Sequence, residues 1–235
     1  MKTLLAGNNL VLDPPEPGCA LCLSGLPGGS GYFHDRSPYG NHGTINGAQW
    51  VKLPGGLWSL QLDGVDDRVQ CADSDSLDIV DNITILTWVK RSNTNRRDIV
   101  VAKKEGGSGF AGFILEIVAD AGRIDCMQFY YQNSNGDWEN NIISQCTVDT
   151  GWHQIAVTRS PQKIRFSLDG KLDPNEYVPS LNMNAVNSHN VVLGGVSTVP
   201  YFAGGIALFR LYNRSLSALE IQNAFFREKS MFGVW

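Results

Sequence analysis

Two carboxylates, Glu116 and Asp120, come nearest in this 235-residue chain to the pair that a glycosidase needs. Such a pair stands about 5 Å apart in retaining enzymes and farther apart in inverting ones. Glu116 and Asp120 lie at the end of the apolar run 113–118. On a strand they would share a face but lie roughly 13 Å apart along it, too far for a nucleophile and an acid to act together. This spacing predicts a protein that is not an enzyme.

Aromatic and amide side chains gather instead between residues 129 and 141. Sugar sites use aromatic faces to cover C–H patches, and amide or carboxylate groups to hydrogen-bond hydroxyls. The candidates surround a turn and are Tyr130, Tyr131, Asn133, Asn135, Asp137 and Trp138. A second loop, 196–202, offers Tyr201. We expect one of these loops to contact a glycan or a protein surface. The alternative is that Tyr130 or Tyr131 belongs to the core and the rest is an ordinary polar hairpin.

The other reactive side chains do not form a recognisable catalytic or metal motif. For His153 the favoured interpretation is a strand-end histidine that hydrogen-bonds across a sheet. Among the five cysteines, Cys19 and Cys22 form a C-x-x-C motif, but no second motif or histidine pair completes a zinc site. An odd number of cysteines favours structural thiols over a disulfide framework. Cys126 and Cys146 could still face each other on neighbouring strands.

Composition limits the classes of partner. The formal net charge is −4 and no Lys/Arg cluster is present, so nucleic acid is not an expected partner. No apolar run approaches the roughly 18 residues of a membrane span. Near the N-terminus Asn8, Asn9 and Asp13 interrupt the apolar residues before a secretory signal can form. We therefore expect synthesis in the cytosol and a function outside the cell, for example on a virus particle released by lysis.

Short extended runs joined by turns predict an all-β domain over residues 19–235. Ile164, Phe166 and Leu168 alternate with polar residues, which is the pattern of a strand with one wet face. Runs 83–89 and 113–118 are apolar at successive positions, so we expect central strands covered on both sides.

One helix and one terminal arm complete the expected organisation. Ser217 and Glu220 form a capping box at the start of the helix. Leu219, Ala224 and Phe225 are its expected anchors. Residues 1–18 contain three prolines and predict an arm that packs on its own domain or reaches a neighbouring subunit.

Several segments follow, in order, the motifs of one family. Residues 33–50, FHDRSPYGNHGTINGAQW, match its entry loop, and residues 59–79, SLQLDGVDDRVQCADSDSLDI, match its "DGvDD" signature. Residues 83–90, 151–159 and 163–170 match three of its strands, and residues 205–221 match its last strand and helix. The chain resembles the laminin-G-like branch of the concanavalin A-like lectin/glucanase superfamily. The resemblance implies a two-sheet antiparallel jelly-roll sandwich with one short C-terminal helix.

The resemblance also implies where ligands bind. Family members bind sugars in the groove of a concave sheet and at its rim loops, and the enzymes carry an E-x-D-x-E strand that this chain lacks. For a structural calcium ion the entry loop offers Asp35 and Asn41, whose oxygen atoms suit this cation. The acidic position that commonly completes such a site is occupied by Ala207, which supplies no side-chain ligand.

These observations favour a non-catalytic recognition module that binds carbohydrate or a protein surface through rim loops. It would belong to an extracellular or virion surface assembly, as a decoration or receptor-contacting protein, with the N-terminal arm available for self-assembly or capsid contacts. The alternatives are a purely structural shell protein without a sugar ligand, and a glycosidase.

Overall fold

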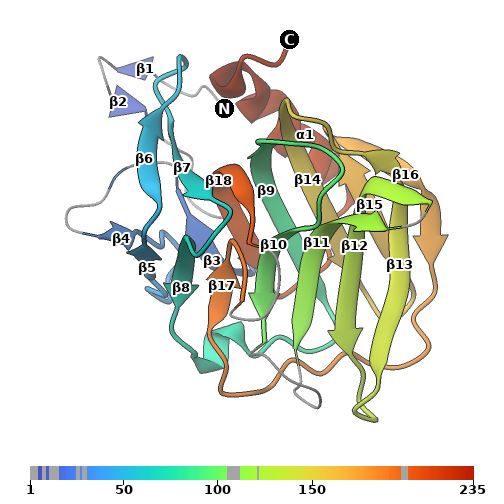
Figure 1. Ribbon diagram of the computed structural model, residues 1–235. Coiled ribbons are helices and arrows are strands. Elements are labelled where there is room, and N and C mark those ends of the chain that lie inside the picture. The colour runs from blue at the N-terminus through green and yellow to red at the C-terminus, as the bar shows by residue number, and fades with distance from the viewer. Residues whose placement is uncertain are drawn as a thin grey trace.

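Two antiparallel β-sheets lie face to face in the computed structural model (Figure 1), which confirms the predicted all-β jelly-roll sandwich. The structure describes residues 16–24, 27, 31–104, 112–120, 122–196 and 201–235, together with the backbone of two short strands nearer the N-terminus. These are β1 (Leu5–Ala6) and β2 (Asn9–Leu10), which pair with each other. The rest of the expected arm before residue 16 lies outside the described residues.

The sheet nearer the viewer in Figure 1, called the front sheet, has the order β13-β12-β11-β10-β17-β8-β5-β4. Its strands are β4 (Tyr32–Phe33), β5 (Gly43–Asn46), β8 (Arg68–Cys71), β10 (Asp98–Lys103), β11 (Phe113–Asp120), β12 (Arg123–Gln132), β13 (Trp138–Thr147) and β17 (Val191–Leu193). A short 3-10 helix, η1 (Asp75–Leu77), follows β8.

The second sheet, called the back sheet, has the order β16-β15-β14-β9-β18-β7-β6, with β3 added beside β18. Its strands are β3 (Cys19–Leu23), β6 (Gln49–Lys52), β7 (Trp58–Asp63), β9 (Ile83–Arg91), β14 (Trp152–Arg159), β15 (Ile164–Leu168), β16 (Lys171–Tyr177) and β18 (Ala203–Tyr212). The turn from β15 to β16 is Asp169-Gly170, and both residues have positive φ, as a two-residue hairpin turn requires.

The main core fills the space between the sheets. Alternate residues of each strand point inward, so Ile164 and Phe166 on β15 are fully buried opposite Phe113 and Leu115 of the front sheet. Each such side chain stabilises the fold by roughly 1.5–3 kcal/mol relative to exposure. The period-2 pattern of the sequence therefore becomes the inner wall of the sandwich.

The outer side of the back sheet is covered by the C-terminal helices α1 (Ala218–Glu228) and η2 (Lys229–Phe232). The capping box is present: the Ser217 hydroxyl accepts the Glu220 N–H, and the Glu220 carboxylate accepts the Ser217 N–H. The helix buries Ala224 and Phe225 as expected. Leu219 was wrongly expected to anchor it and is 63% exposed, because it lies on the opposite side of the helix from the buried face.

The outer side of the front sheet carries no helix of the described chain, as Figure 1 shows. We call this side the open face. The expectation that residues 113–118 are covered on both sides agrees with the burial of this strand, because the outward-facing Ile114, Glu116 and Val118 are only 7%, 0% and 3% exposed. Ile114 packs there in a small cluster with Ile99, Ala102, Val192 and Val196, and Tyr130 packs against this cluster. The open face thus carries its own layer of buried side chains, and no helix of the described chain lies over it.

One edge of the sandwich is closed by hydrogen bonds between the two sheets. Asp173 on β16 accepts the backbone N–H groups of Gln145 at 2.9 Å and Cys146 at 2.7 Å on β13. The Tyr177 hydroxyl donates to the Ile143 carbonyl at 2.6 Å. These bonds satisfy backbone groups of an edge strand that would otherwise be free to pair with another chain. In the described part of the chain, no helix is long and apolar enough to cross a membrane.

Candidate functional site

Glu116 is fully buried on the open face and is held by two neighbours. Its Oε2 atom accepts from Arg97 Nε at 2.8 Å, and its Oε1 atom accepts from the Tyr130 hydroxyl at 2.5 Å. The carboxylate thereby fixes both neighbours against the sheet. The side chain of Asp120 lies outside the described residues. Tyr130, a predicted ligand-binding residue, is half-buried and stands on the open face.

Trp138 lies on the same face, at the start of β13. It pairs with Gln132 across the β12–β13 hairpin, and the ammonium of Lys104 sits over its ring at 4.9 Å from the centroid. A cation over an indole face is attracted by the ring quadrupole. Lys104 directly follows β10, two strands away from β12 in the sheet. Burial, and then the nearby Arg97, lower the pKa of Lys104.

Tyr201 lies on the other side of Lys104, at a pocket of about 240 Å³ over β10, β17 and β8. The side chains that matter for binding come from two strands, β8 and β17, and from three positions outside the strands; they are Arg68, Gln70, Val192, Lys104, Asn190 and Tyr201. The hairpin with Trp138 and the loop with Tyr201 are therefore brought together on one face, and Lys104 contacts the first and lines the pocket of the second. We call this assembly of pocket, Lys104 and Trp138 the open-face site.

The sequence did not point to Arg68, Gln70, Lys104 or Asn190. Each is a polar residue in a strand or directly beside one, and such residues usually form a solvated surface. No local motif identifies them, because they converge only through the register of β10 with β17 and of β17 with β8.

Tyr131 and Asn133, also predicted to bind ligand, face away from the open-face site. Tyr131 is fully buried in the core, with the Arg159 guanidinium 4.6 Å from its ring centroid. The alternative interpretation, that one of the paired tyrosines belongs to the core, is correct for Tyr131. Asn133 is buried under the turn, where its Oδ1 atom accepts the N–H groups of Asn135 and Asp137, each at 3.0 Å.

Asn135 and Asp137 are exposed at the tip of that turn. Their backbone N–H groups are used to close the turn, so the tip is a rigid support for the neighbouring Trp138. Asn135 and Asp137 thus stand beside the open-face site and do not line its pocket.

Asp35 and Asn41, the residues predicted for calcium, organise the entry loop. Asp35 Oδ1 accepts from the N–H groups of Cys22 at 2.7 Å and Ser37 at 2.8 Å. Its Oδ2 atom accepts from the Ser37 hydroxyl at 2.6 Å and the Asn41 N–H at 2.7 Å. The Asn41 side chain bonds Ser76 and the Ala20 carbonyl. Both carboxylate oxygens of Asp35 are therefore already satisfied by protein donors.

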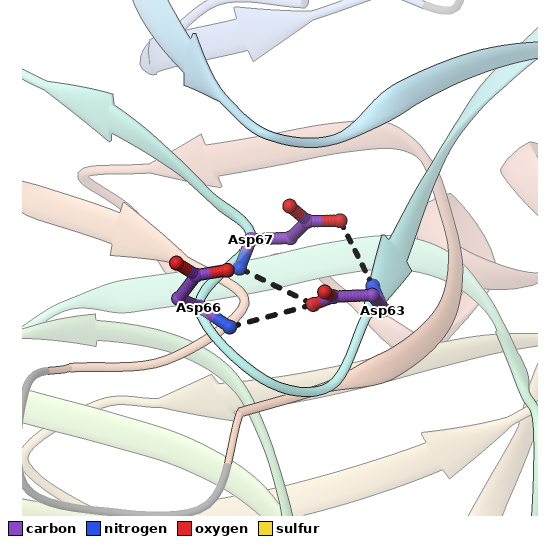
Figure 2. A group of neighbouring side chains, drawn as sticks. All are labelled: Asp63, Asp66 and Asp67. Atoms are coloured by element: carbon purple, nitrogen blue, oxygen red, sulfur yellow. Dashed lines mark hydrogen bonds between the residues drawn. The ribbon is translucent and has the colours of Figure 1, made fainter.

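A cluster of three carboxylates follows β7 within the "DGvDD" segment (Figure 2). Asp63, Asp66 and Asp67 have oxygen atoms within 4.8 Å of one another. Asp63 Oδ1 accepts the N–H groups of Val65, Asp66 and Asp67, and Asp67 Oδ2 accepts the Asp63 N–H at 3.0 Å. These bonds lower the pKa of Asp63, while burial raises the pKa of Asp67. The carboxylates of Asp63 and Asp67 thus have a structural role, because their hydrogen bonds to backbone N–H groups hold a tight loop together.

His153 has the structural role that the sequence favoured. Its Nδ1 atom lies 2.8 Å from Asp169 Oδ2, and its Nε2 atom lies 2.9 Å from Asp149 Oδ1. The hydrogen bond with Asp169 is the main cause that raises the pKa of His153. The five cysteines are free thiols, and Cys126 lies opposite Thr147 and not opposite Cys146.

Solved structures with this fold include two binding domains and one domain of an arabinanase. The botulinum neurotoxin serotype G binding domain superposes with a TM-score of 0.68 at 17% identity, over 90% of this chain and 51% of that one. The binding domain of Paraclostridial Mosquitocidal Protein 1 superposes with a TM-score of 0.69 at 16% identity, over 92% of this chain and 55% of that one. The third structure is domain 4 of AbnA, a GH43 extracellular arabinanase from Geobacillus stearothermophilus, in complex with arabinotriose. It superposes with a TM-score of 0.68 at 14% identity, over 87% of this chain and 97% of that one. The chain thus spans about half the length of the toxin domains.

A search of curated protein sequences finds no match. The family model described as "Concanavalin A-like lectin/glucanases superfamily" (Laminin_G_3) matches residues 63–222, which include the hairpin with Trp138 and the loop with Tyr201. The sandwich, the ordered motifs and this match agree, and the chain belongs to the laminin-G-like family of the concanavalin A-like lectin/glucanase superfamily.

Proposed function

We propose that this chain is a non-catalytic recognition domain that binds carbohydrate at the open-face site. The observation that carries the proposal is the convergence of Trp138 and Tyr201 on Lys104, on a sheet face that no helix of the described residues covers. Aromatic faces supply apolar cover for sugar C–H groups, and the amides of Gln70 and Asn190 supply hydrogen bonds to hydroxyls.

Three of the similar solved structures support a binding role. Domain 4 of the arabinanase was solved with arabinotriose, and the two toxin domains are described as binding domains. The non-enzymatic part of the proposal is supported by Glu116. Both of its carboxylate oxygens accept hydrogen bonds from Arg97 and Tyr130, so it is held as a structural anion.

The location that we infer for this function is extracellular, on an assembly such as the surface of a virus particle, where glycan receptors are met. The described end of the N-terminal segment supports packing on its own domain: Glu16 pairs with Arg227 at 3.0 Å and with Arg214 at 3.7 Å. Size-exclusion chromatography with light scattering measures whether the full chain also self-assembles.

The test of the proposed function is a glycan array probed with the wild type and with Trp138→Ala and Tyr201→Ala. The matched control is Tyr39→Ala, an aromatic residue that is 53% exposed and does not line the open-face site. We expect the two site variants to lose about tenfold or more in affinity for the glycans that the wild type binds, and the control to keep its profile. Unchanged profiles for both site variants, or no glycan bound by the wild type, would exclude the proposal.

A further inference from the structure

The pocket of the open-face site offers hydrogen-bond donors and positive charge. Arg68 and Lys104 line it, and none of the described residues that line it carries a carboxylate. Among the described residues, neither cation lies within ion-pairing distance of an acidic side chain; Arg68 donates to the backbone carbonyl of Asp66 at 3.1 Å. On a chain whose formal net charge is −4, two uncompensated cations at one pocket are a local inversion of charge.

The two amides of the pocket are oriented as donors. Asn190 Oδ1 accepts the backbone N–H of Asp73 at 3.2 Å, and a backbone N–H can only donate. Gln70 Oε1 accepts from Asn46 Nδ2 at 3.1 Å, and the same Asn46 amide donates to the Thr44 carbonyl, which fixes its orientation. Their acceptor oxygens are thus engaged outside the pocket, which leaves both NH₂ groups for a ligand.

A buried cation holds this geometry in place. Lys103 is fully buried, and its Nζ atom contacts Asp73 Oδ1 at 2.6 Å and Asp78 Oδ1 at 3.1 Å. It also donates to the carbonyls of Asn187 and His189. Lys103 therefore ties the loop after β8 and the loop before β17 to the end of β10, from which Lys104 extends. The donors of the pocket are positioned before a ligand arrives, which lowers the cost of binding.

The volume of the pocket and the positions of its lining residues indicate which ligand it can hold. About 240 Å³ is below the roughly 300–1,000 Å³ of pockets for drug-sized ligands, which indicates one sugar ring and not an oligosaccharide. The pairing of Gln70 with Val192 places an apolar floor in the middle of the pocket. Lys104 and Asn190 lie toward one end of that pair, and Arg68 and Tyr201 lie toward the other.

We propose that this pocket binds a monosaccharide unit that carries an anionic group, a carboxylate or a sulfate, with Arg68 and Lys104 as its charge-recognising residues. The inference rests on the proposed function and names its ligand class. The anion takes charge-assisted hydrogen bonds from one or both cations, while the Gln70 and Asn190 NH₂ groups donate to the same anion or to ring hydroxyls. The Val192 floor covers the C–H face of the ring.

The experiment measures binding of two matched pairs of sugars by ligand-observed NMR. Glucuronic acid and glucuronamide differ in charge on a carboxyl carbon, and galactose 6-sulfate and galactose differ by a sulfate, so the two pairs separate the two sources of the anion. We expect at least one acidic sugar to bind about tenfold more tightly than its neutral counterpart, and its affinity to fall between low salt and 0.15 M salt.

Variants that each remove one positive charge test whether Lys104 and Arg68 cause the preference for acidic sugars. We expect Lys104→Gln and Arg68→Gln each to lower the affinity for the acidic sugar by about tenfold, the effect of losing one charge-assisted hydrogen bond. The matched control Lys171→Gln, an exposed lysine on the back sheet, should leave the affinity unchanged. Melting temperatures of the variants establish that the fold is kept.

Equal affinities within both pairs, or full acidic-sugar binding by Lys104→Gln and Arg68→Gln, would overturn the anionic ligand class. If the glycan array still shows binding that depends on Trp138 and Tyr201, the proposed function survives that result. If no sugar of either pair binds, the inference fails, and the array alone decides whether the proposed function fails with it.

Discussion

Glu228 joins the C-terminal helix to the back sheet, and its removal should be among the most destabilising single changes in this protein. It is buried, with Oε1 at 2.6 Å from Arg210 Nη2 and Oε2 at 2.7 Å from Trp88 Nε1. The Trp88 ring is also stacked on Phe232 at a centroid distance of 4.1 Å. One carboxylate thus satisfies a nearly buried guanidinium and a buried indole N–H.

Glu228→Ala leaves the Arg210 charge without its partner. Breaking a buried ion pair from one side costs about 3–5 kcal/mol, because a desolvated charge is left uncompensated. The orphaned indole N–H belongs to the same network, so its cost overlaps with this figure. We expect the free energy of unfolding to fall by about 3–5 kcal/mol, and the melting temperature to fall by roughly 6–20 °C, for a domain of this size.

Urea unfolding followed by tryptophan fluorescence measures this change, with two reference variants. Glu228→Gln keeps an acceptor for the Trp88 N–H but removes the charge, and its loss should be smaller than that of the alanine variant. Leu219→Ala, on the exposed side of the same helix, should change stability by no more than about 0.5 kcal/mol. A Glu228→Ala protein within about 1 kcal/mol of the wild type would refute the reasoning, because the carboxylate would then contribute little to docking the helix.

Three further outcomes are expected. Because Asp169 and Asp149 raise the pKa of His153, its contribution to stability is full below the ordinary histidine pKa and is lost as the pH rises through the folded-state value. Urea titrations at pH 5.5 and pH 9 should therefore show that the wild type is more stable than His153→Gln, with a difference in the free energy of unfolding that is smaller at pH 9. A larger difference at pH 9 would contradict this expectation. Asn133→Ala removes the acceptor that closes the β12–β13 turn and should cost about 1–2 kcal/mol in urea unfolding, whereas an unchanged midpoint would show that the turn closes without it. Because Asp35 already accepts four hydrogen bonds, EDTA should leave the melting temperature unchanged within about 1 °C, and a clear drop would establish a calcium ion at the entry loop or elsewhere.

The candidate site could be predicted only in part. Aromatic and amide composition singled out Trp138 and Tyr201, which the structure places on one face, but it did not separate Tyr130 from Tyr131. Those two residues have the same local chemistry and opposite environments: Tyr130 faces outward and Tyr131 lies in the core. Alternation predicts two faces of a strand, yet which face is covered depends on the second sheet, which is far away in sequence.

Features that depend on neighbouring residues were determined by the sequence alone. The period-2 strand of residues 164–168, the turn at Asp169-Gly170 and the capping box of Ser217 and Glu220 are local, because their hydrogen bonds and side-chain directions involve residues a few positions apart. The sandwich topology was predicted from the resemblance of the ordered motifs to those of the family. The tertiary structure alone decided that Lys104 meets Trp138 and that Arg68 shares a pocket with Tyr201. Side chains so far apart in sequence come together through strand register across the front sheet, and register is set by the packing of the whole sandwich.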